Sequence, residues 1–241
     1  MTNTINKGLI ILWAPPRSRS TAFERMIIER GDFLVIHEPF CSLYDTGELL
    51  IKYDDDNTEL KFTSYNKLMR WIQQLSKDRL IFIKETCEYN YREVFSDKPF
   101  LSCAQHAFLV RDLSEIIASH YKMNPNVTPA EIGYENLFRL KRSLQNLGKR
   151  FFKIDSQELV DQPEATILKF CTYMSIPFMR SSLTWEAAQP DIWSRTYHWH
   201  MDAGNSTGFT RTNNVYQATI HNSSHLMELY NYNLPFYRQF L

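Results

Sequence analysis

Hydroxyl and guanidinium side chains are concentrated in one short stretch near the start of the chain. Within it, Arg17 and Arg19 alternate with Ser18, Ser20 and Thr21. All five side chains donate hydrogen bonds, and the two arginines carry a permanent positive charge. Such a set is suited to an oxyanion, with phosphate or sulfate as the natural ligand. We therefore predict an anion site, the alternative being an ordinary loop with a helix cap and two exposed arginines.

The residues on either side of this loop form a strand and a helix. Residues 9–13 are an apolar run typical of a buried strand, which two prolines then end. Ser20 or Thr21 is the expected N-cap of the following helix, and Glu24 would complete a capping box. The helix N-terminus adds unpaired backbone N–H groups and the positive end of a dipole to the loop.

The loop does not have the spacing of a nucleoside triphosphate-binding Walker A motif. In an alignment on Thr21, the two required glycines fall at Ala14 and Arg19, and the required lysine falls at Ser20. An ordinary ATP or GTP hydrolase is therefore disfavoured.

Charged residues also follow the next predicted strands. His37 and Glu38 come after the second strand, Lys84 after the third and Arg111 after the fourth. Because ligands of open α/β sheets bind at the carboxyl ends of the strands, we expect these side chains near the loop. Ser119 lies two helical turns beyond Arg111, so both could reach one phosphate. Taken singly, His37 and Glu38 are equally consistent with a surface or capping role, and a lone strand-end lysine is more commonly at the surface. Arg111 and Ser119 taken singly are ordinary residues.

A small-residue segment in the last third of the chain offers a second place for a phosphate. Ser206, Thr207 and Gly208 are followed closely by Arg211. Small residues allow the backbone to approach a phosphate closely, and the arginine would add charge. A plain surface loop fits the segment equally well.

Four histidines in the last third of the chain could be interpreted as zinc ligands. His198 and His200 are two residues apart, and His221 and His225 have helical i, i+4 spacing. No carboxylate or cysteine accompanies them at ligand spacing, so we expect no metal site. Aromatic lining of an acceptor pocket, or a structural role, is the favoured interpretation.

Composition narrows the class of protein. The chain has 241 residues, 44% of them hydrophobic and 14% aromatic, with a formal net charge of zero. This supports a folded core and gives no support for broad binding to nucleic acid or an anionic membrane. The four cysteines form no C-x-x-C pair, and no apolar run is long enough for a spanning helix. We expect free thiols and a cytoplasmic protein.

Strands and helices alternate along the sequence, which favours one α/β domain over residues 1–241 with a central parallel sheet of about five strands flanked by helices. The predicted strands are residues 9–13, 33–36, 79–83, 106–110 and 151–154. The predicted helices after the first are residues 65–75, a helix capped by Asp112, residues 129–150, residues 163–174 and a C-terminal helix from residue 222. We predict a loop for residues 41–63, with a solvated acidic turn at residues 54–56, and a turn at residues 155–159.

Two of these motifs resemble those of sulfotransferases that use 3′-phosphoadenosine-5′-phosphosulfate (PAPS). Residues 14–21, Ala-Pro-Pro-Arg-Ser-Arg-Ser-Thr, resemble the loop that binds the 5′-phosphosulfate, and residues 108–112 with Ser119 resemble the 3′-phosphate motif. Lys84 is similar to a lysine near the sulfuryl group in many members. Residues 37–40 and 206–209 look like segments of the bacterial small-molecule branch. The resemblance covers the first two-thirds of the chain well and the remainder loosely.

The resemblance implies a P-loop-like sulfotransferase fold and an in-line transfer of a sulfuryl group from PAPS to a hydroxyl or amine. The acceptor would be a small molecule such as a secondary metabolite, the product adenosine 3′,5′-bisphosphate, and no metal is expected. The residues it implies for the 5′ end are Arg17, Ser18, Arg19, Ser20 and Thr21. Those implied for the 3′ end are Arg111 and Ser119, with support from Ser206, Thr207, Gly208 and Arg211.

Three departures from the family pattern affect the expected chemistry. Arg17 stands where many members have lysine, and the glycine-rich segment lacks the arginine-lysine-glycine opening of the animal cytosolic enzymes. The residues after Lys84 lack the histidine that serves those enzymes as base. His37 and Glu38 are therefore the expected sources of the base, without a ranking between them. A P-loop-type kinase and a non-catalytic nucleotide-binding member of the fold are the alternatives.

Overall fold

The computed structural model describes residues 7–53, 58–211 and 215–241. At its centre is a five-stranded sheet in the order β2-β5-β1-β6-β7, in which every neighbouring pair is parallel. The strands are β1 (Gly8–Ala14), β2 (Leu34–His37), β5 (Leu80–Thr86), β6 (Ala104–Val110) and β7 (Phe151–Asp155). The predicted parallel α/β sheet is confirmed.

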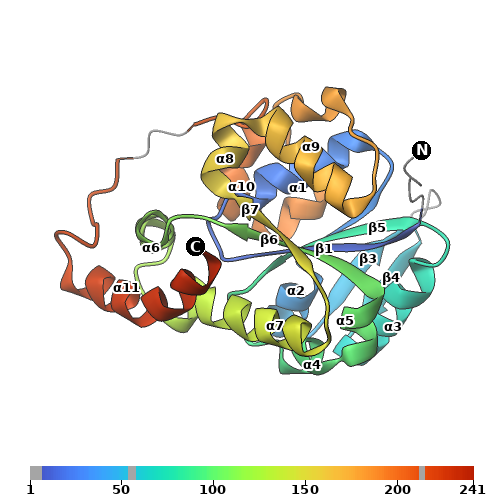
Figure 1. Cartoon of the computed structure of the whole chain (residues 1–241), viewed down its shortest axis with the longest axis horizontal. Helices are drawn as coiled ribbons and strands as arrows, with labels where there is room; N and C mark the ends of the chain where they lie inside the picture. Colours follow the sequence, from blue (N-terminus) through green and yellow to red (C-terminus); the bar gives the residue numbers. More distant parts are fainter. Residues whose placement is uncertain (1–6, 54–57, 212–214) are drawn as a thin grey trace.

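Helices cover both faces of this sheet (Figure 1). One layer contains α1 (Ser20–Arg30), α8 (Ser156–Asp161), α9 (Pro163–Met174) and α10 (Tyr197–Gly204). The other contains α2 (Pro39–Thr46), α3 (Tyr65–Leu75), α4 (Arg92–Ser96), α5 (Lys98–Cys103) and α7 (Tyr134–Asn146). Helices α6 (Leu113–Met123) and α11 (Ser224–Tyr237) pack on each other. Four 3₁₀ helices complete the described elements: η1 (Ala130–Ile132), η2 (Arg180–Leu183), η3 (Asp191–Thr196) and η4 (Arg238–Phe240).

Strand β1 holds the two layers together. Leu9, Ile11 and Trp13 belong to the buried cluster on one side of the sheet, while Ile10 and Leu12 belong to the cluster on the other. Successive side chains of a strand point to opposite faces, so a central parallel strand is apolar throughout. The polar loop that follows β1 is therefore attached to a deeply buried strand at the centre of the sheet.

The expected loop at residues 41–63 is wrong. Helix α2 occupies its start, and the antiparallel hairpin β3 (Leu49–Lys52) and β4 (Glu59–Phe62) follows. Strand β3 buries alternate residues, Leu49 and Ile51, which is the pattern of a strand with one buried face. The acidic run at residues 54–56 lies outside the described residues.

The start of α1 also differs from the expectation. The N-cap is Arg19 in the left-handed region (φ 72°), without a side-chain cap hydrogen bond, rather than Ser20 or Thr21. Glu24 forms no capping box, because its carboxylate accepts hydrogen bonds from His37 and Trp193 instead. The hydroxyls expected to cap the helix are thus not used in that way.

Two further segments were assigned the wrong element. The expected helix at residues 129–150 is interrupted by Gly133, whose φ of 89° separates η1 from α7. The expected turn at residues 155–159 is the start of α8, where the Asp155 carboxylate accepts from the backbone N–H groups of Gln157 and Glu158. Each outcome depends on a local cap or break.

Several local predictions are confirmed. Helix α3 has the predicted bounds, α9 begins at Pro163, and Gly31 ends α1 in the left-handed region. The Asp112 carboxylate accepts from the backbone N–H of Glu115 at 3.1 Å and so caps α6. The C-terminal helix begins at Ser224, two residues after its expected start.

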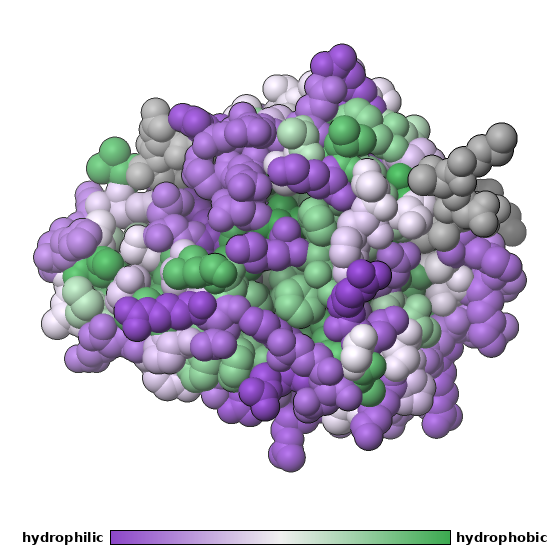
Figure 2. Space-filling view, viewed as in Figure 1, coloured by the Kyte–Doolittle hydropathy of each residue, from purple (hydrophilic) through white to green (hydrophobic). Residues whose placement is uncertain are grey.

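Hydrophilic side chains cover much of the face seen in Figure 2, with hydrophobic ones gathered towards its centre. Among the described helices, none has the length and apolar character needed to cross a bilayer. All four cysteines are free, as expected.

Candidate active site

A cavity of about 310 Å³ opens where the carboxyl ends of the central strands meet. This is the edge at which open α/β sheets bind ligands. Of the sequence-predicted site residues, the following line it: Arg17, Arg19, Ser20, Thr21, Glu38, Lys84, Arg111, Ser119, Ser206 and Gly208. His37, Ser18, Thr207 and Arg211 are not among its lining residues.

The loop after β1 is held in an unusual backbone conformation. Arg17 (φ 64°) and Arg19 (φ 72°) both lie in the left-handed region, which costs free energy for residues other than glycine. Gly133 packs directly beneath the loop, and a Cβ atom there would lie 2.9 Å from Cδ of Pro16. The surrounding structure therefore maintains a loop shape that its own residues do not favour.

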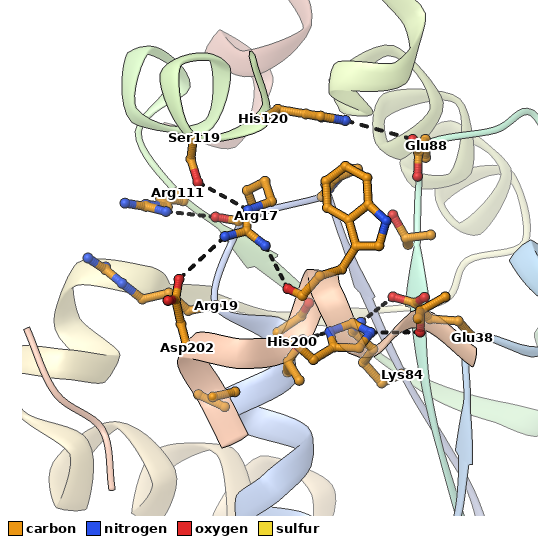
Figure 3. A pocket seen from close by; sticks show the side chains of 18 of the residues that line it. Arg17, Arg19, Glu38, Lys84, Glu88, Arg111, Ser119, His120, His200 and Asp202 are labelled. Atoms are coloured by element: carbon orange, nitrogen blue, oxygen red, sulfur yellow. Dashed lines mark hydrogen bonds and ion pairs between the residues drawn. The ribbon is translucent and has the colours of Figure 1, made fainter. Parts of the chain in front are cut away.

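Arg17 lies at the centre of the polar contacts in the cavity (Figure 3). Its Nε donates to the Ser119 hydroxyl at 3.1 Å, and its Nη1 donates to the Trp199 carbonyl at 2.7 Å. The Asp202 carboxylate lies 3.5 Å from Nη2. Burial lowers the pKa of Arg17 and Asp202 opposes that effect, but a guanidinium stays charged at neutral pH.

The other two arginines bracket the same loop. Arg111 donates to the backbone carbonyl of Arg17 at 2.7 Å and forms an ion pair with Glu115. Arg19 donates to the carbonyl (3.1 Å) and the hydroxyl (3.0 Å) of Ser156, the first residue of α8. The structure therefore brings together the two motifs that the sequence separates by most of a hundred residues.

Ser18 is fully buried, and its hydroxyl has no hydrogen-bond partner. Ser20 is buried at the first position of α1. The backbone between them turns into the helix N-terminus, where N–H groups lack intrahelical partners. Ser18 therefore stays a prediction as a ligand-binding side chain, while Ser20 faces the cavity.

Lys84 and Glu38 form a buried ion pair at the neighbouring strand end. Lys84 Nζ contacts Glu38 Oε1, and the side chains are 3% and 13% exposed. Burial raises the pKa of Glu38, but Lys84, His37 and His200 outweigh it and bring the pKa to about 2. Burial likewise lowers the pKa of Lys84, yet Glu38 and Glu24 leave it above its ordinary value. Both groups are charged at neutral pH.

His37 lies behind Glu38 rather than at the cavity wall. Its Nδ1 is 2.8 Å from the Glu24 carboxylate, and its Nε2 is 3.5 Å from Glu38 Oε2. Glu24 is fully buried and also accepts from the Trp193 indole at 2.7 Å. The buried carboxylate therefore fixes the orientation of the imidazole, which in turn contacts Glu38.

Glu38 itself has a strained backbone. It caps α2 at φ 42° and directly precedes Pro39, where the left-handed conformation is especially unfavourable. A second buried acid, Glu85, stabilises this helix start by accepting from the backbone N–H groups of Phe40 (2.7 Å) and Cys41 (3.3 Å). The start of α2 is thereby fixed so that Glu38 points into the cavity.

His200, one of the histidines predicted to line an acceptor pocket or to have a structural role, lines the cavity. Its two ring nitrogens lie 3.0 Å from the Thr21 hydroxyl and 2.9 Å from the Thr196 hydroxyl. Burial, together with Lys84 and His37, lowers the pKa of His200 to about 2, so the ring is neutral. His200 reaches the cavity because α10 packs over the loop after β1. No local sequence pattern predicts this tertiary contact.

A metal-ligand set is present among the described residues, but not the one considered from the sequence. Ligand atoms of His37, Glu38 and His200 lie within 4.8 Å of one another. The Lys84 ammonium contacts the same carboxylate and opposes a second cation there.

Two more groups at the far side of the cavity were missed. Glu88, just beyond β5, has its carboxylate 3.8 Å from Nε2 of His120 on α6. Both line the cavity. The only sequence signal for His120 is its position next to Ser119, and Glu88 has none.

The small-residue segment is divided by the structure. Ser206 and Gly208 line the cavity, while Thr207 is exposed and accepts a backbone hydrogen bond from Trp185. The Arg211 side chain is 68% exposed and forms an ion pair with Asp161 at 2.6 Å. A role for Arg211 in ligand binding would require it to leave that partner.

Comparisons with known proteins agree with the arrangement of the two motifs around the cavity. A family model described as a sulfotransferase domain matches residues 8–240. The branched-chain-amino-acid aminotransferase-like protein 2 of Arabidopsis thaliana is 28% identical over 218 residues, 84% of this chain but only 36% of the plant protein. The chain thus spans about a third of the length of the curated relatives it matches.

Two solved structures share the fold at low sequence identity. A sulfotransferase domain from the Synechococcus PCC 7002 olefin synthase superimposes with a TM-score of 0.53 at 13% identity, covering 99% of this chain and 96% of that one. A sulfotransferase domain from the curacin biosynthetic pathway gives 0.51 at 13% identity, covering 95% and 98%. At this identity the likeness concerns the fold.

Proposed function

Because the chain belongs to the sulfotransferase domain family, we propose that it transfers a sulfuryl group from PAPS to a hydroxyl of a small molecule. The observation that carries this proposal is the contact of Arg17 with both Ser119 and Arg111. It joins the two motifs expected to bind opposite ends of the nucleotide into one continuous site. A cytoplasmic setting and an acceptor of low molecular mass are parts of the same proposal.

The residues present fit an anionic donor. Arg17 has its closest carboxylate at 3.5 Å, and Arg19 donates to neutral oxygens of Ser156. Their positive charge faces the N-terminus of α1 across the same small cavity. The donor would supply an activated sulfuryl group on a phosphate leaving group. Arg17 and the backbone N–H groups at the start of α1 would stabilise the charge that develops on that phosphate.

Lys84 and Glu38 would act together in the transfer. In this structure they neutralise each other. When Lys84 turns to the sulfuryl oxygens, Glu38 loses its closest cation, so its pKa rises and its carboxylate becomes a better proton acceptor. Glu38 lines the cavity, and we therefore assign it as the base that removes the acceptor proton.

His37 would position that base. It lies behind Glu38, and the buried Glu24 carboxylate orients its ring. Its side chain is 7% exposed, so direct access of an acceptor to the ring is restricted. This arrangement divides the joint role expected for His37 and Glu38 into a proton acceptor and its support.

Isotope transfer tests the proposal. The protein is incubated with ³⁵S-labelled PAPS and a panel of small alcohols, phenols and amines. Label should appear in at least one acceptor together with an equal amount of adenosine 3′,5′-bisphosphate. Transfer of ³²P from γ-labelled ATP to the same panel would instead favour phosphoryl transfer. Transfer of neither label, with nucleotide binding intact, would indicate a non-catalytic member of the fold.

A further inference from the structure

The arginines that line the cavity lie on one side of it, and two of its glutamates lie on the other. In Figure 3, Arg111, Arg17 and Arg19 lie together with Asp202, whose carboxylate pairs with Arg17, and Glu88 and Glu38 lie across the cavity. The positive side is accounted for by the anionic donor proposed above. The positive charge of Lys84 is taken up by Glu38, so the remaining acidic groups on the other side have no such explanation.

Glu88 is the central member of this acidic side. Its side chain is 20% exposed, and Asp45 and Glu131 line the same cavity. Burial is the main reason that the pKa of Glu88 is raised to about 8, and Glu38, Glu131 and Asp45 raise it further, while Lys84 opposes them. Burial among other acids therefore favours the protonated, uncharged form of this carboxyl group.

The unpartnered ring nitrogens of His120 independently indicate that a ligand binds on this side of the cavity. Its side chain is fully buried, it lines the cavity, and neither ring nitrogen has a hydrogen-bond partner. Burial lowers the pKa of His120 to about 4, with Arg17 acting in the same direction, so the ring is neutral and one nitrogen is a free acceptor. Buried polar groups without partners are uncommon and costly. The nearest acidic oxygen, on Glu88, is 3.8 Å away.

Aromatic rings border the same side. Tyr89 and Trp199 line the cavity, and Trp199 meets the His120 ring edge to face at 5.6 Å between centroids. Tyr89 is held by stacking on Tyr44 at 4.0 Å. Faces of aromatic rings attract cations.

We propose that the acceptor carries a protonated amine, which binds between the Glu88 carboxylate and the His120 ring, and that a hydroxyl of the same molecule faces Glu38. The inference rests on the proposed sulfotransferase function and specifies its substrate class as hydroxyl-bearing amines. An ammonium group would donate hydrogen bonds to the Glu88 carboxylate and to the acceptor nitrogen of His120, so it would supply a cation for the acid and a partner for one of the two unpartnered ring nitrogens.

Binding of the cation ionises Glu88, and that proton leaves to solvent. The acceptor oxygen then attacks sulfur, the bond between sulfur and the bridging phosphate oxygen breaks, and the hydroxyl proton passes to Glu38. The amine remains protonated throughout and is not the nucleophile.

Binding of isosteric pairs tests this substrate class. Isothermal titration calorimetry measures tyramine against 4-propylphenol, and ethanolamine against 1-propanol, with and without saturating adenosine 3′,5′-bisphosphate. The cationic member of at least one pair should bind about tenfold more tightly, as expected for a charge-assisted hydrogen bond. Binding at pH 7 should release a proton, which appears as a dependence of the measured heat on the ionisation enthalpy of the buffer.

Substitutions locate the effect. Glu88→Gln should remove the preference for the cation and the proton release, whereas Glu93→Gln on the exposed surface of α4 should change neither. A preference that survives Glu88→Gln, equal binding within both pairs, or no binding by either pair would overturn the inference. Binding of adenosine 3′,5′-bisphosphate is recorded in the same samples, so failure of the donor site is seen separately from failure of the cation site.

Discussion

Glu38 and Lys84 are each buried with an opposite charge as the closest neighbour, and each would be costly to leave alone. This pairing explains how two charged groups can be stable in a partly closed cavity without a ligand. It also gives a reason for the strained backbone of Glu38, because the left-handed cap of α2 points the carboxylate at Lys84. Strain of this kind persists where surrounding structure imposes it.

Replacing Glu38 with glutamine tests its role as base. Glu38→Gln should lower kcat by about 10²–10⁴, the usual contribution of general base catalysis, while the Kd for adenosine 3′,5′-bisphosphate stays nearly unchanged. His37→Asn should cause a smaller loss, because Glu38 remains. Steady-state kinetics and calorimetry on both variants give the comparison. A larger loss in His37→Asn than in Glu38→Gln would make His37 the base.

The raised pKa of Glu88 has a consequence for stability. An unfolded glutamate has a pKa of about 4.3, and the folded value is about 8. The native state therefore holds a proton that the unfolded state releases, and stability falls as pH rises between these values. Glu88→Gln cannot titrate, so its melting temperature relative to the wild type should be higher at pH 9 than at pH 5. Thermal denaturation at both values checks this, and the same difference at both would contradict it.

Among the elements of the fold, α7 supports the loop after β1 as much as β1 and α1 do. Gly133, at the N-cap of α7, allows the backbone to approach Pro15 and Pro16. A methyl group at this position has no room, and the φ of 89° disfavours any side chain.

Two glycine substitutions separate these effects. Gly133→Ala should destabilise the protein by about 1–3 kcal/mol more than Gly148→Ala, the typical cost of overpacking. Gly148 also has a positive φ (65°), but a Cβ there meets nothing within 4 Å. Urea denaturation of both variants measures the difference. Equal destabilisation would show that the loop tolerates the extra atom.

Helix α10 covers the loop after β1, and two of its oxygen atoms contact the Arg17 guanidinium that a bound phosphate would also contact. Asp202, which is 71% exposed, pairs with Arg17, and the neighbouring Trp199 carbonyl accepts from the same guanidinium. A phosphate at Arg17 would meet this carboxylate as a repulsive neighbour.

Removing that negative charge should therefore improve nucleotide binding. Asp202→Asn is expected to strengthen the binding of adenosine 3′,5′-bisphosphate by about two- to fivefold, in line with the small free energies of exposed ion pairs. Asp191→Asn in η3, also exposed, serves as the control. Weaker binding by Asp202→Asn would mean that Asp202 holds Arg17 in its productive position.

Helices and strands with strong hydrophobic periodicity were predicted well from the sequence. Side-chain positions that depend on tertiary contacts were predicted poorly. The apolar runs predicted all five central strands, because a parallel sheet buries both of its faces. The sequence did not predict the β3–β4 hairpin because its strands are short and only one of their faces is buried, so that polar residues make up half of β4. Glu88 and His120 were missed, and the contacts of His200 were not predicted, because these residues come together only in the folded chain.

At the scale of the whole molecule, two hydrophobic clusters on opposite faces of one sheet fix the strand ends that carry the polar residues. The sheet order β2-β5-β1-β6-β7 places Glu38, Lys84, the Arg17 loop and Arg111 side by side along one edge. An anion at the loop and a cation at Glu88 would then occupy the two sides of one cavity. The plant relatives are much longer than this chain, so the substrates of those proteins need not be its own.

We propose that the cavity binds a nucleotide with phosphates at both the 3′ and 5′ positions. Thermal shift with adenosine 3′,5′-bisphosphate, ADP and ATP–Mg²⁺ measures this binding, because a ligand that binds only the native state raises the melting temperature. We predict that the bisphosphate gives the largest rise, and that Arg111→Ala reduces this rise more than it reduces the effect of ADP. Stabilisation by ATP–Mg²⁺ without stabilisation by the bisphosphate would contradict the account.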